Sequence, residues 1–184
     1  MNPDTILWTD DLVFAEYAKA ELKVERVWTQ AIVEYLASRG HIDRAVAEEA
    51  CAKLVGFNYH ATVFRGNALV AALRISNGSV DAFPMHQMIQ AFAPVAISAL
   101  VADRKMALLT LGEFILQLSL EPFLPETKCV ATKALLDKFP TDAATKAQLE
   151  LFSVQCAKAM NLHPMGQANF LTCFDQWKRG ELTL

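Results

Sequence analysis

The chain has 184 residues, of which 53% are hydrophobic and 20% charged, and its formal net charge is −3 at pH 7. This composition excludes a disordered chain, and the even spread of 17 basic and 20 acidic residues argues against nucleic-acid binding by the isolated chain. The mean hydropathy of +0.22 is high for a protein of this size. We therefore expect nearly all apolar residues to lie inside, or some of them to cover a partner's surface.

Membrane and secretory segments are also excluded by the pattern of apolar residues. No run reaches the roughly 18 uninterrupted residues of a membrane span, because Pro94, Asp103, Glu113 and Gln117 interrupt the two most apolar regions. The first residues lack the basic region and the long apolar run of a secretory signal. We expect a cytoplasmic protein without a membrane partner, in which the four cysteines stay reduced.

The first 56 residues predict a small α/β segment. Short apolar or alternating runs indicate strands, and amphipathic spacing indicates helices between and after them. Gly40 and Gly56 suit the ends of helices, and Asp43 suits an N-cap. In chain order, the expected elements are a strand over residues 5–8, a helix over 12–22, a strand over 24–27, and helices over 28–39 and 44–55.

The rest of the chain predicts helices only. Pro94 is expected to kink or break one of them, and Thr141 is expected to cap another. The helix over residues 106–120 is apolar on all sides, which predicts a position deep inside the fold or inside an interface. The expected helices cover residues 68–75, 84–105, 106–120, 126–139, 142–160 and 165–179.

These elements predict a mainly α fold. A small α/β N-terminal segment, with the order strand, helix, strand, helix, is followed by an all-helical bundle. The composition changes near residues 77–79. We therefore expect a partial α/β segment over residues 1–78 and a helical tail domain over residues 79–184.

The residue types that most often carry chemistry are scattered along the chain. The histidines lack metal-binding spacing, and the cysteines form no CxxC pair. This favours surface or turn histidines and buried thiols on helix faces. No phosphate-binding loop or nucleophile elbow is present. The residues concerned are His41, His60, His86, His163, Cys51, Cys129, Cys156 and Cys173.

One acidic pair, Asp10 and Asp11, follows the first predicted strand directly. Two adjacent carboxylates where a strand meets a helix can bind a hard divalent cation, which prefers oxygen ligands. The same residues can instead cap the helix that follows, with a contribution of about 1 kcal/mol to stability and no catalysis. Both interpretations of the pair stay open at this point.

Several segments together resemble the C-terminal portion of PIN-domain nucleases, over about residues 5–75. The arrangement is similar to that of large bacterial proteins in which such a segment precedes a helical tail. The resemblance rests on the order of residues 6–11 with Thr9-Asp10-Asp11, an alanine-rich helix, residues 24–30, a helix ending in Gly40-His41-Ile42-Asp43, and Gly56-Phe57.

The resemblance implies a family of RNA endonucleases that hold Mg²⁺ or Mn²⁺ with three or four carboxylates. It assigns Asp11 to the late metal-binding aspartate of the family and Asp10 to its neighbour, as catalytic and metal-binding residues of an incomplete site. The other acids of the family would precede the first residue. Asp43, Glu48 and Glu49 lie on or before a helix away from that site, so we do not expect them to substitute.

The sequence therefore leaves three functions open. The first is a non-catalytic helical protein-interaction or regulatory module, with no cofactor and no enzymatic activity of its own. The alternative is a latent Mg²⁺- or Mn²⁺-dependent endoribonuclease half that needs a partner segment. A third is a small-molecule sensor with a pocket among the apolar helices of residues 84–124. A homodimer is expected, because a second copy can cover an unpaired strand edge and an apolar face.

Overall fold

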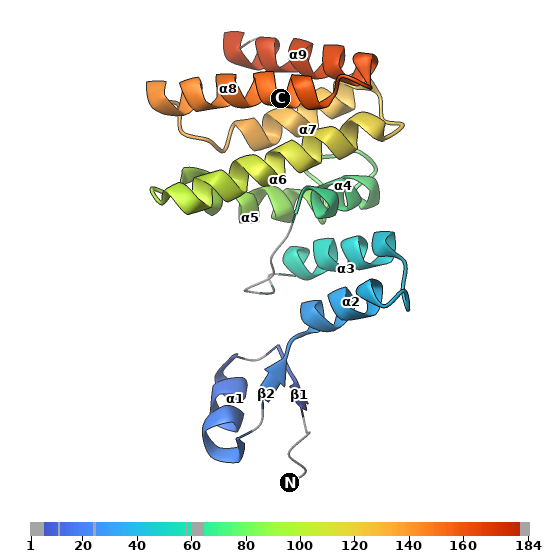
Figure 1. Cartoon of the computed structure of the whole chain (residues 1–184), viewed down its shortest axis with the longest axis vertical. Coiled ribbons are helices and arrows are strands. Elements are labelled where there is room, and N and C mark those ends of the chain that lie inside the picture. Colours follow the sequence, from blue (N-terminus) through green and yellow to red (C-terminus); the bar gives the residue numbers. More distant parts are fainter. Residues whose placement is uncertain (1–5, 11, 24, 58, 60–64, 181–184) are drawn as a thin grey trace.

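The computed structural model describes residues 6–10, 12–23, 25–57, 59 and 65–180. It confirms a mainly α fold with a small α/β segment near the N-terminus (Figure 1). The molecule is elongated, with the strands at one end and the last two helices at the other. The elements are β1 (Ile6–Trp8), α1 (Leu12–Tyr17), the π-helical η1 (Ala18–Leu22), β2 (Glu25–Val27), α2 (Thr29–Ser38), α3 (Arg44–Gly56), α4 (Gly66–Ile75), α5 (Met85–Ile97), α6 (Val101–Leu120), α7 (Pro125–Leu136), α8 (Ala143–Ala159) and α9 (Pro164–Arg179).

The N-terminal elements form a single βαβ unit. Strands β1 and β2 pair in parallel, with Ile6 opposite Glu25 and Trp8 opposite Val27. The predicted helix over residues 12–22 is present, but its second half is π-helical. This π turn ends at Lys23, whose φ of 55° is left-handed and whose N–H donates to the carbonyl of Ala18.

The hydrophobic core extends continuously from α3 to α9, and its closest helix packing is among α3, α4, α5 and α6. Leu69, Leu73, Phe92 and Phe114 are fully buried there. Helix α4 lies so close to α6 that a Cβ on Gly66 would overlap the backbone nitrogen of Phe114. The core contains residues from both sides of position 78 and continues across it, and the division into two domains there stays a prediction.

Two local predictions about helix boundaries are wrong. The helix predicted over residues 84–105 ends at Ile97, and it is not broken at Pro94. Pro94 is exposed, so water can bind the carbonyl that its missing N–H leaves without a helical partner. The chain turns further on, at Ser98, whose hydroxyl accepts the N–H of Leu100 and donates to Asp103 at 2.6 Å.

The second wrong prediction concerns the start of α8. The capping residue is Asp142 and not Thr141, because the Asp142 carboxylate accepts the N–H of Thr145 at 2.9 Å. The hydroxyl of Thr145 donates to the other carboxylate oxygen at 2.7 Å. These two hydrogen bonds lower the pKa of Asp142 below its ordinary value, since they favour the charged form.

Helix α6 is buried on one face only. Leu111 and Phe114 lie in the core, whereas Met106, Leu109 and Leu120 are at least half exposed. The predicted position deep inside the fold therefore holds for one side of the helix, and the other side forms an apolar surface. Within the described residues, no helix combines the length and the apolar run needed to cross a membrane.

Candidate functional site

The carboxyl ends of β1 and β2 lie together, as parallel strands require, and this edge is where open α/β sheets usually bind ligands. Asp10 follows β1, and Thr29 begins α2 directly after β2. One oxygen of the Asp10 carboxylate accepts the Thr29 N–H at 2.9 Å, and the other accepts the Thr29 hydroxyl hydrogen at 2.5 Å. The indole N–H of Trp8 donates to the same hydroxyl at 3.1 Å.

Asp10 therefore has a capping role, but for a different helix than expected. The sequence suggested a cap for the helix that follows directly, whereas the carboxylate caps α2, 19 residues further along the chain. An N–H group in the first turn of a helix has no partner inside that helix, so the carboxylate satisfies it and faces the positive end of the helix dipole. Asp10 ties the end of β1 to the start of α2.

A metal site at Asp10 finds no further ligand in the part of the chain that the structure describes. Asp11, the second predicted ligand, lies outside the described residues. Among those that are described, no three His, Cys, Asp or Glu side chains are grouped to hold a metal ion. Asp43 is the N-cap residue of α3, and Glu48 pairs with Arg44 in the same helix. The metal assignment of Asp10 and Asp11 stays a prediction.

A polar cavity of about 610 Å³ lies next to the sheet edge, between α2, α3 and the start of α4. Trp28 directly follows β2 and also lines the cavity, so the cavity and the carboxyl edge of the sheet are neighbours. Arg44 occupies one wall and donates to Glu34 at 2.6 Å and to Glu48 at 3.4 Å. The full lining consists of Trp28, Gln30, Ala31, Glu34, Arg44, Glu48, Cys51, Arg65, Asn67 and Ala68.

The charged groups of this cavity are largely engaged with one another. The hydrogen bond to Glu34 raises the pKa of Arg44, so the guanidinium is a structural cation. Cys51 contacts Gln30 at 3.7 Å and Glu34 at 3.8 Å, and burial raises the pKa of its thiol. A protonated thiol is a poor nucleophile. Glu34, Arg44 and Glu48 therefore form an ion-pair network, and the Cys51 thiol is not activated.

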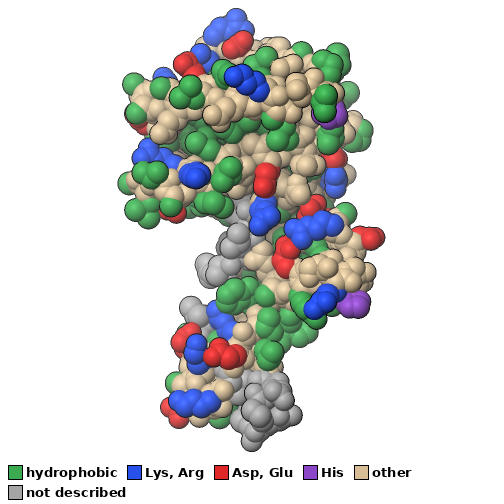
Figure 2. All heavy atoms as spheres, viewed as in Figure 1, with side chains coloured by type: hydrophobic (Ala, Val, Ile, Leu, Met, Phe, Trp, Pro, Cys, Tyr) green, Lys and Arg blue, Asp and Glu red, His purple; other side chains and the backbone are tan. Residues whose placement is uncertain are grey.

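The βαβ unit itself leaves a large apolar surface uncovered. Ile6 and Trp8, two residues apart on β1, are 64% and 63% exposed, and Val13 and Tyr17 of α1 are also exposed. Figure 2 shows hydrophobic side chains gathered over the narrow lower part of the molecule, where the strands and α2 lie. Parallel sheets are normally covered on both faces, and two strands alone are marginally stable.

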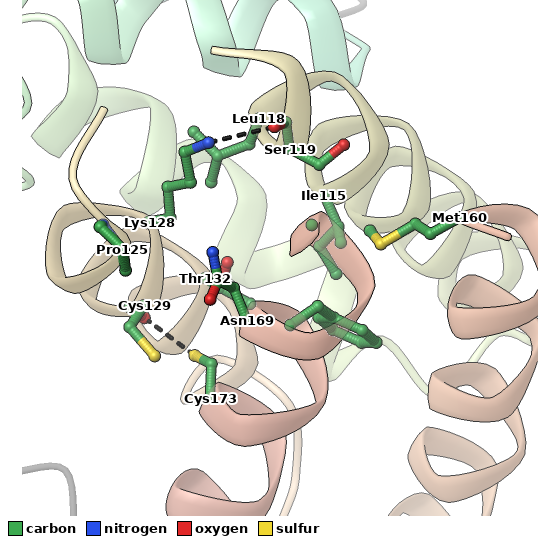
Figure 3. A pocket seen from close by; sticks show the side chains of 12 residues that line it. Ile115, Leu118, Ser119, Pro125, Lys128, Cys129, Thr132, Met160, Asn169 and Cys173 are labelled. Atoms are coloured by element: carbon green, nitrogen blue, oxygen red, sulfur yellow. Dashed lines mark hydrogen bonds between the residues drawn. The ribbon is translucent and has the colours of Figure 1, made fainter. Parts of the chain in front are cut away.

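A second, much smaller pocket of about 30 Å³ lies between α6, α7 and α9 (Figure 3). Lys128 donates to the carbonyl of Ser119 at 3.1 Å, and the thiol of Cys173 donates to the carbonyl of Cys129 at 3.4 Å. Burial raises the pKa of both thiols and lowers that of Lys128. The space is that of about one water molecule, so this pocket is too small for an organic ligand.

The scattered histidines and cysteines are placed largely as predicted. His41 follows α2, His86 lies on α5 and His163 precedes α9, all three exposed. His60 lies outside the described residues. The four cysteines are free thiols, three of them buried and Cys129 half-buried. Burial raises the pKa of Cys156 to about 12, which makes its thiol inert at neutral pH.

Comparison with known proteins gives no match to any family model, any curated protein or any solved structure. The resemblance to PIN domains is therefore carried by the sequence order described above.

Proposed function

We propose that this chain is a non-catalytic helical protein-interaction or regulatory module, derived from a PIN-like nuclease. Its βαβ unit docks on an α/β segment that supplies further parallel strands. The observation that carries the proposal is the exposure of Ile6 and Trp8, both above 60%, on a sheet of two parallel strands. A sheet of this kind lowers its free energy when more strands pair with its edges and an apolar face covers it.

The chemistry of such an interaction follows from strand addition. The outer edge of β1 offers backbone N–H and C=O groups to a neighbouring strand, and those hydrogen bonds provide affinity. Burying the exposed parts of Ile6 and Trp8 would add on the order of 1–2 kcal/mol each. The absence of catalysis is supported by Asp10, both of whose oxygens already accept hydrogen bonds from Thr29.

The proposal is tested by site-specific photo-crosslinking in cells. A benzophenone amino acid replaces Trp8 in one variant and Met165, which is 75% exposed on α9, in a control variant. We expect one adduct of defined mass at position 8 that is missing at position 165. Adding Ile6→Lys to the position-8 variant should remove this adduct, because a charge on the same strand opposes docking. An adduct that Ile6→Lys leaves unchanged, or no adduct, would contradict the proposal.

The alternative is a latent Mg²⁺- or Mn²⁺-dependent endoribonuclease half. It is favoured by the position of Asp10 at the carboxyl end of a parallel strand, where α/β folds place functional groups. Its test is cleavage of a structured RNA in Mn²⁺ by the purified chain, beside the double variant Asp10→Ala, Asp11→Ala. We expect no cleavage by either, since hydrolysis needs a metal fixed by several oxygens and a water aimed at the phosphate. Cleavage that disappears in the double variant at equal folded fraction would establish the nuclease function instead.

A further inference from the structure

A second apolar surface lies far from the βαβ unit, between α6 and α8. It is a groove of about 580 Å³, in which Leu109 is 53% and Leu151 is 68% exposed. Figure 2 shows hydrophobic side chains in this hollow of the upper part of the molecule. Its apolar lining consists mainly of Leu108, Leu109 and Leu116 from α6 and Leu151, Phe152 and Ala159 from α8.

The charges of this groove are few and arranged symmetrically along α6. Among the lining residues only Lys105 and Glu113 are charged. Each lies four residues from Leu109, on opposite sides of it, and residues four apart share one face of a helix. The face therefore carries a cation at one end, an anion at the other and an apolar residue midway, with no net charge.

Such a pattern is complementary to itself. If two α6 helices lie antiparallel across a two-fold axis beside Leu109, Lys105 of each copy faces Glu113 of the other. Leu109 then meets Leu109 of the second copy. A two-fold interface requires that one patch match an identical patch in this way. A patch with charges of one sign would instead repel its own copy and favour a different partner.

We propose that the α6–α8 groove is the surface through which two copies of this chain form a homodimer, with the two-fold axis at Leu109. Among the described residues, Lys105 forms no ion pair within its own chain. The side chain of Glu113 is held in place, because one of its oxygens accepts the N–H of Gly66 at 3.1 Å. An oriented carboxylate loses less side-chain entropy when it accepts the lysine of a second copy.

This inference is independent of the proposed function, because it concerns other helices at the other end of the molecule. It also assigns self-association to a different surface than the strand edge that the sequence suggested. One side of α6 is buried in the core. The apolar residues on its exposed side are not part of the core, and the second copy would cover them.

The sharpest test is disulfide trapping with the full chain. A residue on a two-fold axis lies opposite itself, so Leu109→Cys should form a disulfide-linked dimer when diamide oxidises the two thiols. Val46→Cys, at a site 52% exposed on α3, should give at least tenfold less, as should the wild-type chain with its native cysteines. Equal cross-linking at positions 46 and 109, or none at 109, would overturn the proposal.

Light scattering over a hundredfold concentration range supplies the second readout. We expect a wild-type dimer, a monomer for Leu109→Lys, and at least tenfold weaker association for Lys105→Glu, since that change places two carboxylates opposite each other. Lys53→Glu makes the same charge change at an exposed position of α3 and should leave the dimer intact, as should Ile6→Lys. Far-ultraviolet circular dichroism confirms that the variants are folded. A wild-type monomer, or a dimer lost in Ile6→Lys but kept in Leu109→Lys, would overturn the α6–α8 assignment. The first of these outcomes leaves the cross-link at position 8 unaffected, which separates the two proposals.

Discussion

Helix α4 and strand β1 are both apolar segments of the same chain, but the structure covers only one of them. In α4, seven of the ten residues are buried. In β1 no residue is buried, and the two outer ones are more than 60% exposed. Helix α4 finds α3, α5 and α6 around it within this chain, whereas β1 has a single strand neighbour among the described elements.

The comparison shows that apolar character does not by itself produce burial. A helix satisfies its own backbone hydrogen bonds and needs only apolar neighbours, which this chain provides in abundance. A parallel strand needs strands on both edges and cover on both faces before its side chains are buried. The helical part therefore supplies most of the stability of the fold, whereas the βαβ unit keeps its apolar side chains exposed.

The largest contrast is expected from truncating one aromatic side chain in each region. Phe114→Ala should lower the free energy of unfolding by about 3–5 kcal/mol, because it opens a cavity in the core. Trp8→Ala should cost less than about 1 kcal/mol, since most of the side chain is already in water. Urea unfolding followed by circular dichroism measures both. Equal losses would show that the sheet contributes to the same cooperative core.

A smaller effect is expected from adding a methyl group where two helices touch. Gly66→Ala places its Cβ against the backbone of α6, which cannot rotate away, and should cost about 3 kcal/mol. Gly40→Ala is the matched control, because it has open space but a left-handed φ of 72°, and should cost about 1 kcal/mol. The reverse order of thermal unfolding midpoints would refute the close approach of α4 and α6.

The ion pair that joins α4 to the end of α6 should make the core sensitive to acid. Arg74 donates two hydrogen bonds to Glu121, at 2.7 Å and 2.5 Å, and these lower the pKa of Glu121. Because the folded pKa is below the unfolded one, the stabilisation is complete above the unfolded pKa, roughly 4.3. It is lost as the pH falls through the lower folded pKa.

The pair is tested with Glu121→Gln, which should cost about 1–2 kcal/mol at pH 7. The difference from the wild type should shrink as the pH falls from 5 towards 2, as followed by urea midpoints. Glu150→Gln removes the exposed pair with Lys178 and should cost less than about 1 kcal/mol. A pH-independent cost of Glu121→Gln would mean that packing, and not charge, explains its contribution.

The smallest effect on the core should come from the link between β1 and α2. Asp10→Ala removes both hydrogen bonds to Thr29 and should lower the local stability of the βαβ unit by about 1 kcal/mol. Hydrogen exchange should become faster at residues 6–8 and 25–27 and stay unchanged in α4, since the link lies outside the core. A double-mutant cycle with Thr29→Val measures the coupling of the two residues. Faster exchange in α4 as well would contradict the separation of the two regions.

Much of the fold could be predicted from local patterns in the sequence. Helical spacing located most helices to within a few residues, although α5 ends at Ile97 and not at residue 105. Short apolar or alternating runs located both strands. Gly40, which was predicted to end a helix, follows α2 with a positive φ, which glycine adopts without a steric penalty. These features depend on neighbouring residues along the chain, so a single sequence contains the information.

The candidate site was less predictable, because its contacts join distant segments. Asp10 reads as a cap for the next helix or as a metal ligand, yet its partner Thr29 is 19 residues away. Pro94 reads as a helix break, yet its exposed position lets α5 continue. The periodicity of the sequence does not show that Pro94 will be exposed, or that the N–H of Thr29 will lie next to Asp10.

The sequence by itself determined where helices and strands form, because backbone preference and the spacing of apolar residues act over a few positions. Only the tertiary structure decided which apolar faces stay open. It buried one side of α6 and left Leu109 exposed, and it placed Glu113 at the N-terminus of α4, 47 residues away. The physical reason is that burial and remote hydrogen bonds depend on which elements become neighbours in space.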